Sequence, residues 1–146
     1  MPQQFLLDVM VGKLATYLRM CGYDTMYAGD EGLEADAAIR ERAQTSGRTL
    51  VTRDRDLAAS TEGALLLTDR EIEGQLAELR DQGVDIDLPS EPERCSVCNG
   101  RVDAVDERPE HAPDGVRVWQ CRDCGQYFWK GSHWEQVQET IDTVSE

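Results

Sequence analysis

The chain has 146 residues, a formal net charge of −14 and an isoelectric point near 4.4. This length allows one domain of ordinary size with a small additional module, and no apolar run is long enough to span a membrane. Residues 1–89 hold 17 acidic and 9 basic residues and residues 90–146 hold 12 and 6, so the overall charge argues against long-range attraction to nucleic acid.

Residues 1–89 alternate short apolar segments with amphipathic ones, which is typical of an α/β domain. We expect strands at residues 4–7, 24–28, 49–52 and 64–67. We expect helices at residues 10–21, from Ala35 to a stop at Gly47, and after a capping box from Thr68 to Glu71. Strands that alternate with helices form right-handed βαβ units, so the prediction is a mainly parallel sheet with helices on both faces.

A linker with two prolines, Pro89-Ser90-Glu91-Pro92, separates this first domain (residues 1–89) from a second module (residues 90–146). The second module is too small to bury a sizeable core and would depend on a bound metal for stability. Its polar segment at residues 103–117 is expected to be a mobile loop. A second capping box, from Ser132 to Glu135, is expected to open a C-terminal helix.

Four cysteines in the second module form two pairs, Cys95-Ser96-Val97-Cys98 and Cys121-Arg122-Asp123-Cys124, with 22 residues between the pairs. Each pair makes a tight turn that directs two thiolates at one point, and two such turns supply the tetrahedral Cys₄ shell of a structural Zn²⁺. The pattern predicts a zinc ribbon whose filled shell leaves no open position for catalysis. The alternative is disulfides, which a reducing cytoplasm disfavours, and we expect a cytoplasmic location because no signal peptide is visible.

Four aspartates are expected at the edge of the sheet where ligands of open parallel sheets bind, beyond the carboxyl ends of the strands. Asp8 follows the first strand, Asp54 and Asp56 follow the third, and Asp36 lies near the start of the second helix. Carboxylates close together repel one another unless a cation binds, and their oxygens suit Mg²⁺ or Mn²⁺ in a site for phosphodiester cleavage. As structural alternatives, Asp8, Asp36 and Asp54 could cap a turn or a helix start, and Asp56 could be solvated.

Three motifs follow one another along the chain and resemble those of a known family. The first is Phe5-Leu6-Leu7-Asp8 with Gly12-Lys13-Leu14-Ala15 and Leu18-Arg19-Met20-Cys21-Gly22-Tyr23-Asp24-Thr25, and the second is Gly47-Arg48-Thr49-Leu50-Val51-Thr52-Arg53-Asp54. The third is the cysteine ribbon that ends in Tyr127-Phe128-Trp129-Lys130-Gly131-Ser132-His133-Trp134. Together they resemble the Mut-seven C-terminal ribonuclease domain family, a PIN-like nuclease fold joined to a zinc ribbon.

The resemblance implies a PIN-like three-layer α/β sandwich with Mg²⁺-dependent ribonuclease activity on RNA. By position, it places the acidic site at Asp8, Asp36 and Asp54, with Asp56 as a fourth residue. It also assigns basic positions, which suit phosphate binding, to Lys13, Arg19 and Arg53.

Aromatic residues crowd the end of the ribbon, next to Lys130 and His133, which are candidate contacts to substrate phosphate. The rings of Trp129 and Trp134 could stack on unpaired bases, but we favour a role in packing the ribbon against the α/β domain.

The sequence therefore predicts a cytoplasmic Mg²⁺- or Mn²⁺-dependent endoribonuclease with a structural Zn²⁺. A non-catalytic RNA- or ribosome-binding zinc-ribbon protein is the main alternative, and a ribbon that docks a protein partner is a third. The diffuse acidic surface has only two lysines and is typical of proteins from a salt-rich cytoplasm, although an ordinary acidic protein would also show it.

Overall fold

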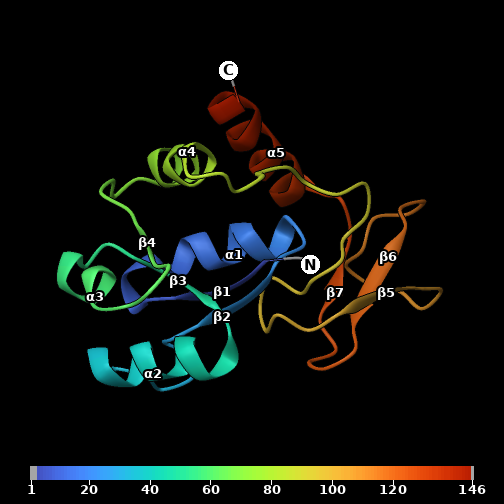
Figure 1. Cartoon of the computed structure of the whole chain (residues 1–146). Helices are drawn as coiled ribbons and strands as arrows, with labels where there is room; N and C mark the ends of the chain where they lie inside the picture. Colours follow the sequence, from blue (N-terminus) through green and yellow to red (C-terminus); the bar gives the residue numbers. More distant parts are fainter. Residues whose placement is uncertain (1–2, 146) are drawn as a thin grey trace.

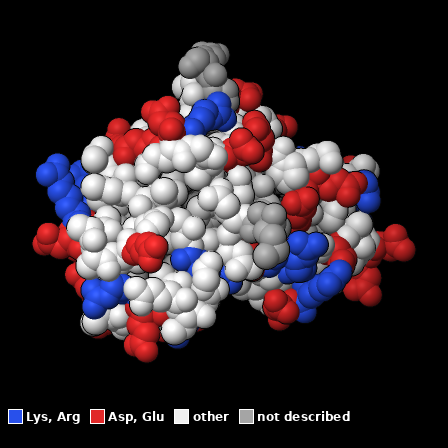
Figure 2. All heavy atoms as spheres, in the orientation of Figure 1, with Lys and Arg blue, Asp and Glu red and all other residues white. Residues whose placement is uncertain are grey.

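The computed structural model describes residues 3–145 and shows an α/β part beside a smaller ribbon part (Figure 1). The α/β part contains a four-stranded sheet in the order β2-β1-β3-β4, and every pairing in it is parallel. Its strands are β1 (Gln4–Leu7), β2 (Asp24–Tyr27), β3 (Thr49–Thr52) and β4 (Leu65–Leu66). The predicted mainly parallel α/β sheet is confirmed, and Figure 2 shows acidic side chains on both parts, as the even spread of charge suggests.

Helices cover both faces of the sheet and give the fold three layers (Figure 1). The helices are α1 (Gly12–Met20), α2 (Asp36–Ser46), α3 (Arg55–Ala59), α4 (Ile72–Asp81) and α5 (Ser132–Ser145), and a single 3₁₀ turn, η1 (Val9–Val11), precedes α1. None of the helices in the described part of the chain has the length and apolar character needed to cross a membrane.

The alternation of side chains along each strand divides the core into two clusters, one on each face of the sheet. Phe5 and Leu7 belong to the larger cluster, together with buried residues of α1, α4 and α5. Leu6 and Leu50 belong to the smaller cluster, which α2 and α3 cover. Burial on both faces thus explains why Phe5-Leu6-Leu7 and Leu50-Val51 are apolar at consecutive positions.

The C-terminal helix α5 returns from the ribbon to the α/β part. Val137 and Ile141 are buried in the larger core cluster, and α5 packs against α4. The helix that follows the ribbon in sequence therefore completes the layer that α1 and α4 begin.

The ribbon contains an antiparallel sheet in the order β5-β6-β7, which comprises β5 (Val102–Val105), β6 (Val118–Cys121) and β7 (Tyr127–Phe128). The prediction of a loop from residue 103 is wrong at its start, because residues 103–105 lie in β5 and pair with β6. The polar residue Asp103 suits this short strand because its side chain is exposed and pairs with Arg122.

Both predicted capping boxes are wrong in detail. Glu71, and not Thr68, is the N-cap of α4, and its side chain makes no cap hydrogen bond. The N–H and the hydroxyl group of Thr68 instead donate to the carboxylate of Glu78, at 2.8 and 2.9 Å. Ser132 is the first residue of α5 and not its N-cap, and the carbonyl of Gly131 accepts the N–H of Glu135.

Candidate functional site

Asp8 and Asp54 lie at the same edge of the sheet, because each follows one of two neighbouring parallel strands. Asp8 follows β1, Asp54 comes two residues after the end of β3, and Leu7 pairs with Val51 in the register of these strands. The N–H of Asp8 donates to the carbonyl of Val51 at 3.1 Å and extends the pairing by one residue. The predicted convergence of these two aspartates on one edge follows from this topology.

The carboxylate of Asp8 is buried, with 4 % of the residue exposed, and both oxygens accept hydrogen bonds. Oδ1 accepts the N–H of Val9 at 2.7 Å, and Oδ2 accepts the hydroxyl proton of Thr52 at 2.7 Å. The Thr52 oxygen in turn accepts the N–H of Asp54 at 3.0 Å. Thr52 therefore connects the two aspartates through one hydroxyl group.

Asp54 is the N-cap of α3. Its Oδ1 accepts the N–H groups of Asp56 and Leu57 at 2.9 and 3.1 Å, so the capping role that the sequence left open is present. Its other carboxylate oxygen has no hydrogen-bond partner in the part of the chain that the structure describes. The hydrogen bonds of the fold therefore leave that oxygen unused.

The other two predicted acidic residues are exposed. Asp36 is the first residue of α2 and Asp56 lies in the first turn of α3. Among the described residues, no group of three or more carboxylates is placed so that it could hold a metal ion. The structure thus brings together Asp8 and Asp54 through Thr52, and does not gather the four aspartates into one compact group.

The basic residues predicted at this edge have different environments. Lys13 is exposed in the first turn of α1. Arg53 is half-buried between β3 and α3, and its Nε lacks a hydrogen-bond partner in the described chain. These two side chains are the cations that sequence position places next to Asp8 and Asp54.

Arg19 is buried and joins the α/β part to the ribbon. Its Nε donates to the carbonyl of Thr25 at 2.9 Å, and its Nη1 donates to the carbonyls of Ser96 and Val97, both at 3.2 Å. Its Nη2 also lies 3.6 Å from a carboxylate oxygen of Asp30. In this arrangement the guanidinium is engaged with protein groups at the first cysteine turn.

The four predicted zinc ligands converge. The Sγ atoms of Cys95, Cys98, Cys121 and Cys124 all lie within 4.8 Å of one another, and the described cysteines form no disulfide. Two of the Sγ–Sγ separations are 3.4 and 3.7 Å. Sulfurs around a tetrahedral Zn²⁺ with Zn–S bonds of about 2.3 Å would be about 3.8 Å apart, so the group has the dimensions to hold a zinc ion.

Backbone N–H groups surround two of these sulfurs. Val97 and Cys98 donate to the Sγ of Cys95, both at 3.4 Å, and Asp123 and Cys124 donate to that of Cys121 at 3.4 and 3.5 Å. Burial raises the pKa of Cys95 to about 12. Burial alone would also raise the pKa of Cys121, but hydrogen bonds from the backbone of Cys124 and Asp123 lower this pKa to about 7. At Cys121 the backbone donors thus favour the thiolate that a metal requires, whereas at Cys95 burial outweighs them.

Asn99, which follows the first cysteine pair, was not identified from the sequence, yet it fixes the ribbon to β2. Its φ of 73° is left-handed, a conformation that asparagine tolerates better than most residues. Its amide accepts the N–H of Thr25 at 2.8 Å and donates to Asp24 at 2.7 Å. Burial alone would raise the pKa of Asp24, but hydrogen bonds from Arg48 and Asn99 hold that pKa below its usual range.

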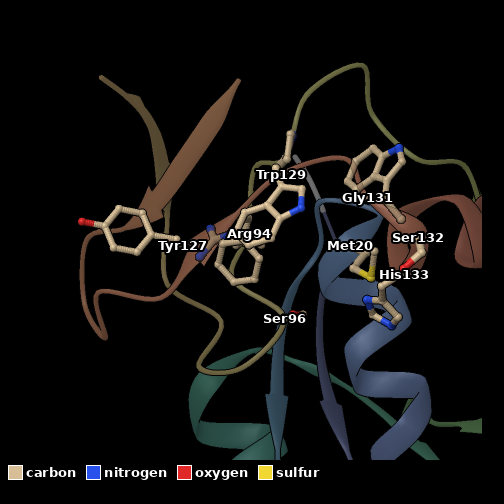
Figure 3. Close-up of a pocket in the computed structure, with 11 residues that line it drawn as sticks. Met20, Arg94, Ser96, Tyr127, Trp129, Gly131, Ser132 and His133 are labelled. Carbon is tan, nitrogen blue, oxygen red and sulfur yellow. The ribbon is translucent and has the colours of Figure 1, made fainter. Parts of the chain in front are cut away.

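His133 lines an aromatic cavity (Figure 3), and Lys130 lies over the ring of Trp134, another residue of its lining. The Nζ of Lys130 donates to the carbonyl of Ser90 and lies 5.5 Å from the ring centroid of Trp134. His133 is exposed in the first turn of α5 and lines the cavity. Trp134 packs against the larger core cluster, as expected, whereas Trp129 belongs to neither cluster.

The aromatic cavity and the Asp8–Asp54 edge lie near opposite ends of helix α1. Helix α1 runs between them: it begins shortly after Asp8, and Met20 at its last turn lines the cavity. The ribbon is therefore attached at the amino ends of the strands, away from the predicted carboxylate site.

A family model described as the Mut7-C RNAse domain matches residues 3–141, which is nearly the whole chain. No curated protein and no solved structure shows a match to the chain.

Proposed function

The chain belongs to the Mut7-C RNAse domain family, which indicates a nuclease-like function with RNA as substrate, and we propose that it is a metal-dependent endoribonuclease. The observation that carries this proposal beyond family membership is the pair Asp8 and Asp54, which follow adjacent parallel strands and connect through Thr52. A buried, hydrogen-bonded carboxylate next to one with an unused oxygen suits a cation better than two solvated carboxylates would.

In this proposal Asp8 and Asp54 hold Mg²⁺ or Mn²⁺, and Asp36 and Asp56 are candidates for further ligands from α2 and α3. Carboxylate oxygens are the donors these ions prefer, and each oxygen of Asp8 keeps a lone pair beyond its one hydrogen bond. The ion, when bound, supplies charge neutralisation at the scissile phosphate and lowers the pKa of a water.

The remaining chemistry belongs to side chains of this chain. Lys13 and Arg53 bind the phosphate. The Thr52 hydroxyl donates a hydrogen bond to Asp8 and so fixes the orientation of that carboxylate. Arg19 acts indirectly in this scheme, because its contacts to Ser96 and Val97 hold the ribbon against the domain. We further propose that the four cysteines hold one structural Zn²⁺, which requires a reducing compartment such as the cytoplasm.

The test is a cleavage assay on end-labelled single-stranded RNA with Mg²⁺ or Mn²⁺. Asp8→Asn and Asp54→Asn should each lower the rate by at least about 100-fold, because even outer-shell partners of a metal contribute roughly 10- to 100-fold. Asparagine is also a good N-cap, so Asp54→Asn removes the charge while it retains the cap of α3. Asp114→Asn, in the exposed loop between β5 and β6, is the matched control and should cleave normally. Cleavage that persists unchanged in the Asp8→Asn, Asp54→Asn double variant would refute the assignment.

RNA binding without cleavage is the second candidate function. It is favoured by the separation of the four aspartates, since the described chain gathers no three carboxylates around one point. A protein of this kind would bind RNA equally with and without added Mg²⁺ and would cleave no RNA under any divalent ion tested.

A further inference from the structure

A cavity of about 260 Å³ lies where the ribbon, the start of α5 and the end of α1 meet (Figure 3). Its aromatic lining includes Phe128, Trp129 and Trp134, and its polar lining includes Arg94, Ser132 and His133. Ligand pockets for drug-sized molecules occupy roughly 300–1,000 Å³, so this cavity suits one small planar group.

Two of these aromatic rings are not part of the hydrophobic core. Trp134 packs against the larger cluster, but Phe128 and Trp129 belong to neither cluster and are half-buried. The ring of Trp129 contacts that of His111 with a centroid separation of 5.3 Å and also lies against Gly131, where an added Cβ would come within 3.0 Å of Nε1. The indole is thus supported by its neighbours while it lines an open cavity.

The lining of the cavity contrasts with the acidic chain. The net charge is −14, yet no aspartate or glutamate is among the described residues that line this cavity. Arg94 lines it: its Nη1 donates to the carbonyl of Asn99 at 3.0 Å and its Nη2 lies 3.8 Å from Asp24, but its buried Nε has no hydrogen-bond acceptor in the described chain. Lys130 lies over the ring of Trp134, and Ser132 and His133 belong to the first turn of α5, where free N–H groups and the helix dipole favour an anion.

We propose that this cavity binds one unpaired nucleotide of RNA. The base stacks on Trp129, and its phosphate lies between Lys130 and the first turn of α5. A planar aromatic group that carries an anion is the ligand that combines these two features, and a single base fits the volume. The identification of that nucleotide as part of an RNA substrate rests on the ribonuclease function proposed above.

The distance between the cavity and the proposed cleavage site indicates which nucleotide of the RNA substrate the cavity would bind. Helix α1 has nine residues, so at about 1.5 Å per residue it is about 14 Å long, and the two sites lie beyond its two ends. Nucleotides stacked at about 3.4 Å need roughly four residues of one strand to cover the helix alone. The cavity would therefore hold an unpaired nucleotide at least about four positions from the cleaved bond and would select single-stranded RNA.

Nucleoside monophosphates test the cavity without any cleavage step. The full-length zinc-loaded protein is titrated with AMP and with UMP while the indole N–H signals of its three tryptophans are followed by NMR. The signals of Trp129 and Trp134 should shift together with either nucleotide. Trp119 lies in β6 outside the cavity, is 4 % exposed, and should not shift. Absence of a shift at Trp129 and Trp134 with both nucleotides would overturn the proposal.

Variants extend the test to RNA, with fluorescein-labelled oligo(A) and oligo(U) as probes and anisotropy as the readout. Trp129→Leu should weaken binding by about 5- to 150-fold, the range expected when one base loses its aromatic partner. Val97→Ser removes an exposed apolar side chain of the same ribbon outside the cavity and should bind as the wild type does. Lys130→Gln should weaken binding, whereas Arg122→Gln removes the same charge from the exposed Asp103 pair and should not.

Equal affinity of the wild type and Trp129→Leu for both oligonucleotides would overturn the proposal, as would a photo-crosslinker at position 129 that captures protein and no RNA. These outcomes are independent of the cleavage assay. Nucleotide binding without RNA cleavage would contradict the proposed ribonuclease activity and support the proposed nucleotide site in the cavity. RNA cleavage combined with unchanged RNA binding by Trp129→Leu would support the activity and contradict the nucleotide site.

Discussion

At the scale of single residues, the most informative side chain is Thr52, the last residue of β3. Its hydroxyl donates to Asp8 and accepts from the backbone of Asp54, so one buried group positions both proposed metal ligands. The sequence located Asp8 and Asp54 because both follow apolar strands. It also carried a signal for Thr52, a polar residue at the end of an otherwise buried strand, but the hydroxyl's partners come from another strand and depend on the register.

We predict that Thr52→Val lowers cleavage about 10- to 100-fold and destabilises the protein by about 1–3 kcal/mol, because a buried carboxylate and a backbone N–H lose their partner. Thr52→Ser retains the hydroxyl and should recover most of the activity. Chemical denaturation and the RNA cleavage assay provide the two readouts. Normal cleavage by Thr52→Val would show that the hydroxyl does not position the carboxylates.

Asp24 gives a second residue-scale prediction, which concerns pH. Burial alone would raise its folded-state pKa, but hydrogen bonds from Arg48 and Asn99 and the charges of Arg48 and Arg94 hold that pKa below the unfolded value, which is near 3.9. A depressed carboxylate pKa contributes stability above the unfolded pKa, and that contribution is lost as the pH falls through the folded pKa. The free energy of unfolding should therefore decrease as the pH is lowered below about 4. Asp24→Asn should make the free energy of unfolding less dependent on pH in this range. Asp114→Asn, whose carboxylate is exposed, should retain the slope.

At the scale of elements, strands were easier to predict than the ends of helices. The segments at residues 4–7 and 49–52 each contain consecutive buried apolar residues, and the structure has strands at both. The beginning of α4 depends on the Glu78 carboxylate, which lies ten residues from Thr68 and accepts its hydroxyl proton. Local patterns such as a capping box carry no information on a competing acceptor of this kind.

The cysteine ribbon supports a prediction about metal. We expect close to one zinc per chain, and a chelator should lower the thermal midpoint, because the cysteine turns carry Ser96, Val97 and Asn99 to their partners in the α/β part. Cys95→Ser should lose zinc. Cys21→Ala is the matched control: Cys21 packs against the core far from the other four thiols and should leave the zinc content unchanged. A protein purified under reducing conditions without zinc, with the same midpoint, would contradict the assignment.

At the scale of the whole molecule, the chain interleaves its two parts. Contacts of Arg19 and Asn99 join the ribbon to β2, and α5 buries Val137 and Ile141 in the larger core cluster. The family resemblance covered both parts, but a division of the sequence at the proline linker does not reveal that α5 packs on α4. Its apolar face is visible in the sequence, whereas the partner of that face is set by the three-dimensional path of the ribbon.

We predict that Ile141→Ala destabilises the entire chain by about 2–5 kcal/mol, because it leaves a cavity in the shared core. Unfolding should remain a single transition, in which the fluorescence of Trp119 in the ribbon and the circular dichroism of the helices change together. Two separated transitions would show that the parts unfold independently. Thr143→Ala, on the exposed side of α5, should have a much smaller effect.

The return of α5 to the sheet also determines when the protein can finish folding during its synthesis. Ribosomes release the chain from its N-terminus, so strands β1 to β4 emerge long before residues 132–145. Until those residues appear, the larger core cluster lacks the side chains of Val137 and Ile141 and leaves part of α4 uncovered. A nascent chain therefore carries an incomplete nuclease domain next to the messenger RNA that encodes it, and completion of that domain waits for the final helix.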